Sequence, residues 1–138
     1  MSTNLLTLEG VHTHIGAYHI LHGVDLAVPK GQLTMLLGRN GAGKTTTLRT
    51  VMGLWHASQG RVRFGERDIT ALRTPQIAEL GIAYVPENMG IFSDLTVKEN
   101  MLLAARGAKN AQQMDDTRLQ WIFKLFPAVE KFWNHPAG

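Results

Sequence analysis

Residues 38–45 constrain this chain more than any other stretch, because they read Gly-Arg-Asn-Gly-Ala-Gly-Lys-Thr and satisfy the pattern G-x-x-x-x-G-K-[ST] at every required position. The mostly apolar residues 32–37 precede them, and their length and bounding glycines favour a buried parallel strand. Residues 45–55 are typical of a helix. A strand, a glycine-rich turn and a helix in this order bring backbone N–H groups to one anionic point. The sequence therefore predicts a phosphate site.

Each residue type in this stretch has a physical role. Glycines allow positive φ and remove Cβ atoms that would keep the backbone away from a phosphate. Lys44 supplies a charge for the β- and γ-phosphates, and the Thr45 hydroxyl is a ligand for the bridging Mg²⁺. An accidental glycine-rich turn is the alternative, which the strand and helix on either side disfavour. The predicted nucleotide contacts are Gly38, Arg39, Asn40, Gly41, Ala42, Gly43, Lys44, Thr45 and Thr46.

Composition narrows the class of protein. The 138 residues are 44% hydrophobic, which suits one modest domain or part of one. The net charge of +3 comes from scattered Lys and Arg, so nucleic-acid binding is not indicated. Cysteine is absent, which excludes disulfides and thiolate catalysis. The N-terminus lacks a secretory signal and no apolar run approaches about 20 residues, so we expect any membrane role to come through a partner.

The region before the phosphate loop predicts two strands with a histidine-rich connection. Residues 6–11 suggest an outer strand, and residues 24–28 a second short strand. Four histidines lie between them, two of which would share one face of a strand. No carboxylate accompanies them at a familiar metal-ligand spacing, so we expect surface or turn histidines. These four residues are His12, His14, His19 and His22.

The region after the loop predicts alternating helices and strands. The first helix should bury Leu48, Val51, Met52 and Trp55, which recur at helical spacing. Residues 60–69 predict an antiparallel hairpin. A short helix should begin at Thr74-Pro75 and end near Gly81. Residues 82–85 predict the next buried strand, and residues 86–90 form the loop that leaves its carboxyl end, where ligands bind in open α/β sheets.

The last third predicts two further helices. Residues 96–99, Thr-Val-Lys-Glu, form a capping box, so a helix should begin there and end near Arg106. A polar linker is expected over residues 107–113. Another helix should begin at Asp115 or Asp116 and end at Pro127, with Leu119, Ile122, Phe123 and Phe126 at helical spacing.

Several motifs together resemble the nucleotide-binding domain of an ATP-binding-cassette (ABC) transporter, over essentially the whole chain. They are the phosphate loop, the hairpin near Gly60, residues 84–87 (Tyr-Val-Pro-Glu) and residues 95–100 (Leu-Thr-Val-Lys-Glu-Asn). Within this family, the sequence is most similar to the ATP-binding subunit of branched-chain amino-acid importers, particularly at residues 21–24, 38–46 and 125–127. The implied fold is the N-terminal portion of an α/β P-loop NTPase, with parallel core strands and a small antiparallel part. Residues 1–92 would be an incomplete nucleotide-binding core, and residues 93–138 the start of a helical subdomain.

The resemblance also implies roles for three further residues. Glu87 stands where the family usually carries the Q-loop glutamine, which touches Mg²⁺ and the attacking water, so it is a candidate catalytic and metal-binding residue. Ile15 stands where the family stacks an aromatic ring on adenine. Tyr18 or His14 could supply a ring instead. Stacking of a base on an aromatic ring is worth roughly 1–3 kcal/mol, so its loss would weaken base discrimination.

The function implied by the resemblance is Mg-ATP binding that powers uptake of branched-chain amino acids or a similar small solute. The implied partners are transmembrane permease subunits and a second nucleotide-binding subunit, at the cytoplasmic face of the membrane. Two alternatives are another P-loop NTPase and a non-transport ABC ATPase. Against a GTPase, no D-x-x-G follows the loop and no N-K-x-D is present.

The sequence stops where the family's signature motif would begin. The Walker B strand, the catalytic glutamate and the switch histidine lie beyond that point in the family. By the resemblance, the chain is an N-terminal piece that is not expected to hydrolyse ATP alone. Residues 32–37 would then lack a neighbouring strand, and the chain could self-associate through this exposed sheet edge.

Overall fold

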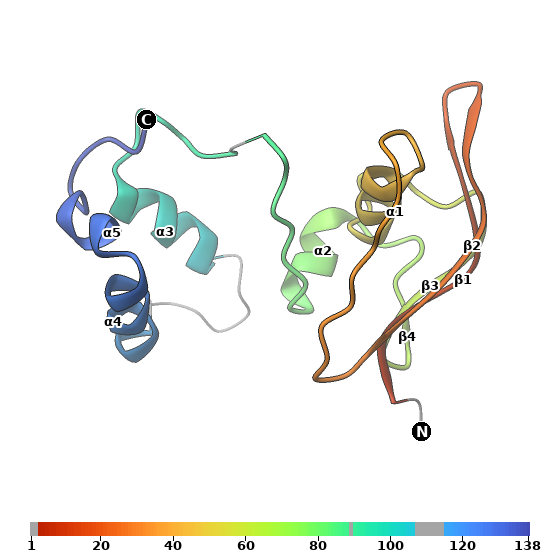
Figure 1. The fold of residues 1–138 in the computed structure, drawn as a ribbon, viewed down its shortest axis with the longest axis horizontal. Helices are drawn as coiled ribbons and strands as arrows, with labels where there is room; N and C mark the ends of the chain where they lie inside the picture. The colour runs from red at the N-terminus through yellow and green to blue at the C-terminus, as the bar shows by residue number, and fades with distance from the viewer. Residues whose placement is uncertain (1–2, 89, 107–114) are drawn as a thin grey trace. The chain divides into compact units, whose positions relative to one another are not determined.

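The structure, a computed structural model, describes residues 3–88, 90–106 and 115–138. It divides into two compact units, Met1–Ile77 and Ala78–Gly138, each described here by itself. The first unit contains an antiparallel sheet and the helix that follows the phosphate loop (Figure 1). The second unit is mostly helical. This mixture of helices with a small antiparallel sheet confirms the α/β class.

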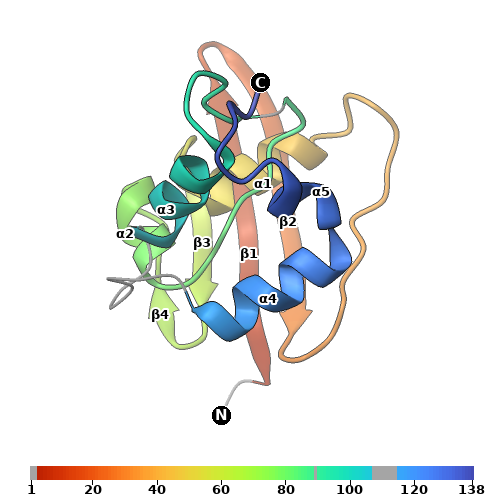
Figure 2. The same ribbon diagram turned by 90° about the vertical axis from the view of Figure 1, so that its left-hand side faces the viewer.

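The sheet of the first unit has four strands in the order β2-β1-β3-β4, with every neighbouring pair antiparallel. The strands are β1 (Asn4–Ile15), β2 (Tyr18–Pro29), β3 (Gln59–Phe64) and β4 (Arg67–Asp68). Figure 2 shows β1 between β2 and β3. The prediction of an outer strand at residues 6–11 was therefore wrong. The apolar side chain of Leu8 lies between Leu26 and Val62 in the register, and burying it requires a partner strand on both sides.

The histidine-rich stretch belongs to the sheet and not to a turn. β1 continues to Ile15 and β2 begins at Tyr18, so all four histidines lie in paired strands. The second strand is accordingly much longer than the predicted residues 24–28. Bulges interrupt the register of β1 and β2, so the hairpin is twisted and the alternation of side chains is hard to see in the sequence.

Helix α1 (Lys44–Val51) packs on this sheet through a face that includes two threonines. Thr47, Thr50, Val51 and Met52 are buried, whereas Leu48 is 47% exposed, so its predicted burial was wrong. The helix also ends earlier than the predicted Trp55. The Thr50 hydroxyl forms its polar contact to the sheet inside the buried face, which explains why a polar residue occupies an interior helical position. The core of the first unit consists of Leu8, Val11, Leu21, Val51, Met52, Val62, Ile69 and Ile77.

Two predicted parallel strands are not formed. Residues 33–39 and 82–86 carry no secondary structure, and the described residues provide no strand that pairs with either segment. Their apolar side chains are correspondingly exposed, with Leu33 at 89% and Val85 at 90%. A β-strand is stabilised by hydrogen bonds to a neighbour, so an apolar extended sequence without one remains unpaired backbone. The predicted parallel core is therefore absent from the described residues.

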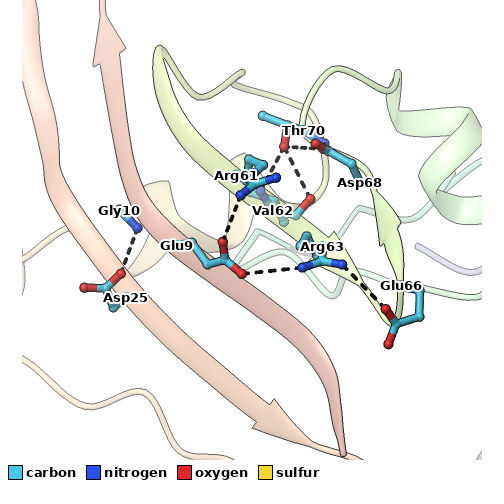
Figure 3. Close-up of polar contacts among 9 residues, drawn as sticks. All are labelled: Glu9, Gly10, Asp25, Arg61, Val62, Arg63, Glu66, Asp68 and Thr70. Carbon is cyan, nitrogen blue, oxygen red and sulfur yellow. Dashed lines mark hydrogen bonds and ion pairs between the residues drawn. The ribbon is translucent and has the colours of Figure 1, made fainter. Parts of the chain in front are cut away.

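The predicted hairpin at residues 60–69 is confirmed as β3 and β4, and polar side chains tie it to β1 (Figure 3). Glu9 pairs with Arg61 at 3.7 Å and with Arg63 at 3.8 Å, and Arg63 also pairs with Glu66 at 3.6 Å. These side chains are partly exposed, so each pair contributes at most about 1 kcal/mol. Their opposite charges favour the observed register of β1 and β3, in which Glu9 pairs with Arg61.

The predicted short helix is α2 (Thr74–Glu79), which ends before Gly81 as expected. The remaining helices are α3 (Val97–Arg106), α4 (Asp116–Leu125) and α5 (Pro127–Lys131). Pro127 ends the predicted helix at the right place but also begins α5, which sequence reasoning missed. The predicted linker at residues 107–113 lies outside the described residues. Among the described helices, none combines the length and the apolar character needed to cross a bilayer.

The start of α3 is well defined inside the second unit. The capping box is confirmed, since Glu99 N donates to Thr96 Oγ1 at 3.0 Å and Thr96 N donates to Glu99 Oε1 at 3.1 Å. The C-terminal segment supplies further acceptors, because Val97 N donates to His135 O and Lys98 N donates to Trp133 O. The first amides of α3 are thus all paired within the protein.

Candidate functional site

The phosphate-loop sequence forms a closed turn that leads directly into α1. Ala42 N donates to Arg39 O at 3.0 Å, and the Lys44 ammonium donates to Gly38 O, which folds the lysine side chain back across the loop. Gly43 is the N-cap of α1 with φ 93°, a conformation that a residue with a Cβ rarely adopts. The predicted contacts from Gly38 to Thr46 therefore lie in one continuous loop and first helical turn.

The amides at the start of α1 have no partner within the described protein. No hydrogen bond from the backbone N–H of Lys44, Thr45 or Thr46 to another described residue is present, and the first paired amide is that of Thr47, which donates to Gly43 O at 2.8 Å. The N-cap glycine offers no side-chain oxygen. Because unpaired helix-terminal amides together with the helix dipole attract an anion, this end of α1 suits a phosphate group.

The other long helices show that this arrangement is specific to α1. Asp115 caps α4 by accepting from Thr117 N at 3.0 Å and from Arg118 N at 3.2 Å, and the first amides of α3 are paired as described above. The first amides of α3 are all paired, and in α4 the Asp115 carboxylate pairs two amides of the first turn. Among the three helices of eight or more described residues, α1 thus keeps its first-turn donors available for a ligand.

The side chains around the loop match the chemistry of a magnesium-bound polyphosphate. Lys44 provides a cation at the same end of the helix as the free amides. The Thr45 side chain is exposed and its hydroxyl makes no hydrogen bond to another described residue, so it is available as an oxygen ligand for Mg²⁺. The residues present therefore fit the predicted ATP and Mg²⁺ site.

The loop packs against the β1–β2 hairpin. A Cβ placed on Gly43 would lie 2.9 Å from Leu21 Cδ2 and 3.9 Å from the carbonyl oxygen of Ile20. β2 therefore passes directly behind the loop, and Tyr18 lies two residues before this contact on the same strand. Sequence reasoning did not identify Ile20 and Leu21 as neighbours of the loop. The only hint in the sequence was the resemblance of residues 21–24 to the importer subunits, and a resemblance does not say which residues touch the loop.

The register of the hairpin separates the three candidates for contact with a base. Thr13 pairs with Leu21, and both are buried on the side of α1. The register shifts between Thr13 and His14. Because Ile15 follows Thr13 by two residues within β1 and pairs with Tyr18, we place this pair on the same face as Thr13. Tyr18 is 75% exposed and offers a free ring. His14 has the opposite orientation, because it precedes Ile15 by one residue and stacks on His19.

Glu87 lies in the second unit, in the segment that follows the unpaired residues 82–86, and its side chain is exposed. No hydrogen bond or ion pair holds this carboxylate among the described residues. The structure thus leaves Glu87 available as a ligand, and a role in metal binding stays a prediction.

Comparison with known proteins gives one consistent family. The family model for ABC transporters matches residues 21–135. The high-affinity branched-chain amino acid transport ATP-binding protein BraG of Pseudomonas aeruginosa is 34% identical over 97% of this chain and 57% of its own length. The probable branched-chain amino acid transport ATP-binding protein LivF of Archaeoglobus fulgidus is 35% identical over 87% of this chain and 50% of its own length. Other relatives are named as ribose and sulfate/thiosulfate import ATP-binding proteins.

Solved structures agree with the sequence relatives. A structure described as the ATP-binding subunit of an ABC transporter superposes with a TM-score of 0.81 at 25% identity, covering 96% of this chain and 54% of that one. The chain thus spans about half the length of the relatives and the solved structure that it matches.

Proposed function

This chain belongs to the ABC transporter family. From that membership we propose that it forms the nucleotide-binding part of an importer's ATP-binding subunit. The observation that supports the proposal best is the set of unpaired amides at Lys44, Thr45 and Thr46, beside the Lys44 ammonium. These groups form an anion site of the kind that a triphosphate fills.

In the proposed binding mode, the loop amides hold the β-phosphate and Lys44 leaves Gly38 O to bind the β- and γ-phosphates. The Thr45 hydroxyl becomes a ligand of the Mg²⁺ ion, which neutralises charge on the phosphates when bound. Tyr18 stacks on the base, because it is the exposed ring on the loop side of the hairpin. We propose that ATP hydrolysis needs more of an ABC ATPase than these 138 residues, which span about half the length of the relatives.

Calorimetry of Mg-ATP binding tests the proposal. Lys44→Ala should abolish measurable affinity, because it removes the only ammonium that the described loop contains, while the far-UV circular dichroism stays unchanged. Lys30→Ala is the matched control: it removes one positive charge from an exposed position of the same unit. Equal affinity of the parent and Lys44→Ala would refute the assignment of the loop.

For Glu87 we propose a role as an additional Mg²⁺ ligand, on the strength of its place at the Q-loop position and its unengaged carboxylate. Glu87→Gln removes the charge at nearly constant size. The variant should need more Mg²⁺ for half-maximal ATP binding while its affinity at saturating Mg²⁺ changes little. Equal changes in both quantities would argue against a metal role.

For the transported solute we propose branched-chain amino acids, with other small solutes as the alternative. The BraG and LivF relatives support the first choice, whereas the ribose and sulfate relatives show that similar subunits are named for other solutes. We propose transmembrane permease subunits and a second nucleotide-binding subunit as partners, at the cytoplasmic face of the membrane. Co-purification with candidate permease subunits, followed by solute uptake in vesicles, would test the assignment.

We also propose that residues 32–37 associate with a second copy of the chain when no other strand covers them. The segment has no charge, and Leu33, Met35 and Leu37 are all more than half exposed. Light scattering of the isolated chain should show dimers or larger species, and Met35→Lys should shift them toward monomer. A monomeric parent would count against the association.

A further inference from the structure

Four histidine rings gather on the outer face of the β1–β2 hairpin, opposite to the face that carries Thr13. The register pairs His12 with His22 and His14 with His19. His19 is the centre of the cluster: its ring lies 4.2 Å from that of His14, 3.9 Å from that of His22 and 5.1 Å from that of His12. The nucleotide site described above uses none of these rings.

A hydrogen bond within the cluster requires at least one neutral imidazole. His12 Nδ1 and His19 Nε2 lie 2.9 Å apart, a hydrogen bond that needs a protonated nitrogen on one ring and a bare nitrogen on the other. Two imidazolium rings offer only donors, so full protonation breaks this bond. His14 Nδ1 has a separate contact with Ser58 Oγ at 2.8 Å, which joins the cluster to the segment before β3.

The surroundings of His19 also favour the neutral ring. Desolvation against its neighbours, followed by the charges of His22, His14 and His12, lowers the pKa of His19 below its usual 6.5. These are the titratable groups that act on it from β1 and β2, while Ser58 of the adjoining segment is uncharged. Among the described residues, no carboxylate contributes to the pKa shift of His19, and no carboxylate forms an ion pair with a histidine.

We propose that this four-histidine cluster makes the tip of the β1–β2 hairpin a proton-responsive element, closed when the rings are neutral and loosened when they become charged. Since the folded-state pKa of His19 is lowered, its stabilisation is complete above the unfolded pKa of about 6.5 and is lost as the pH falls through the lower folded value. We take protons as the effector, because the hydrogen bond between His12 and His19 depends on the protonation of the two rings.

Amide hydrogen exchange of the whole chain, corrected for intrinsic rates, tests the proposal without any nucleotide. Between about pH 7.5 and about pH 5.5, the protection of residues 13–20 should fall by about tenfold for each pKa unit of the shift. His19→Gln removes the central ring and should abolish this pH dependence. His56→Gln is the matched control, since His56 lies in the same unit outside the cluster, with its Nε2 3.2 Å from Leu72 O.

If His19→Gln does not fold, His22→Gln replaces it, because this variant removes one ring and keeps the His12–His19 hydrogen bond. It should reduce the pH dependence. Ring titration followed by NMR should also place the pKa of His19 below its usual 6.5. Protection of residues 13–20 that does not change with pH, or an unchanged pH dependence in the His19 and His22 variants, would overturn the proposal.

Discussion

Thr13 Oγ1 lies 3.1 Å from Thr50 Oγ1, and both side chains are buried between β1 and α1. Thr50 Oγ1 also donates to Thr46 O at 2.8 Å, so its single proton is committed and Thr13 is the donor of the shared hydrogen bond. This contact fixes α1, and with it the phosphate loop, against the hairpin.

Removal of this hydrogen bond should therefore destabilise the first unit. Thr13→Val should lower the free energy of unfolding by about 1 kcal/mol, and Thr50→Val by more, because it leaves the buried Thr13 hydroxyl without a partner. In the double variant the cost should be less than the sum of the two single costs. Urea denaturation measures all three values. Strictly additive costs would show that the two hydroxyls do not interact.

Gly43 should tolerate a side chain less well than Gly41. Both have positive φ, at 93° and 86°, so alanine at either position has the same backbone penalty of about 1 kcal/mol. A Cβ at Gly43 additionally meets Leu21 Cδ2 at 2.9 Å, whereas nothing lies within 4 Å of one at Gly41. Gly43→Ala should therefore unfold at lower urea than Gly41→Ala. Equal midpoints would mean that Leu21 moves aside freely.

Tyr18 should contribute to ATP affinity and His14 should not. Tyr18→Leu removes an exposed ring from the loop side of the hairpin and should weaken Mg-ATP binding by roughly 1–3 kcal/mol in calorimetry. His14→Leu changes a ring on the opposite face and should leave the affinity unchanged. A stronger effect of His14→Leu would show that the face assignment is wrong. If Tyr18→Leu discriminated ATP from GTP no differently from the parent, the ring would not read the base.

The sequence predicted well those features that depend on near neighbours in the chain. The phosphate-loop turn, the capping box at Thr96 and the helix start near Asp115 each involve residues within a few positions of one another, so local geometry determines them. The small hairpin at residues 60–69 succeeded for the same reason.

Features that depend on distant partners were missed. The central place of β1 arises from pairing with β3, some fifty residues later, which the alternation of Leu6 and Leu8 does not reveal. Leu48 was assigned to the buried face by its spacing, but the contact between Thr13 and Thr50 turned a threonine face toward the sheet. Residues 82–85 are apolar enough for a strand, yet pairing requires a neighbour that the described residues do not supply.

In the second unit, the capping box of α3 should make the stability of this helix depend on pH. The backbone hydrogen bond from Thr96, followed by the Thr96 hydroxyl contact, lowers the pKa of Glu99 below its usual 4.5. Because the folded-state pKa is the lower one, the charged side chain stabilises α3 above about pH 4.5, and this stabilisation is lost as the pH falls through the folded value. Glu99→Gln keeps an acceptor but no charge. Its α3 amides should exchange faster than the parent's at neutral pH and equally fast in acid.

Thr96→Ala removes the other half of the box and should destabilise the start of α3 by about 0.5–2 kcal/mol at neutral pH. Part of this cost should disappear in acid, because the Thr96 hydroxyl also helps to lower the pKa of Glu99. Lys98→Ala is the control, since Lys98 is exposed on the same helical turn and its side chain takes no part in the cap. Amide exchange of residues 99–102 distinguishes the loss of the cap in Thr96→Ala from the loss of a surface charge in Lys98→Ala. A Thr96→Ala variant with the exchange rates of Lys98→Ala would show that the carbonyls of Trp133 and His135 suffice to begin the helix.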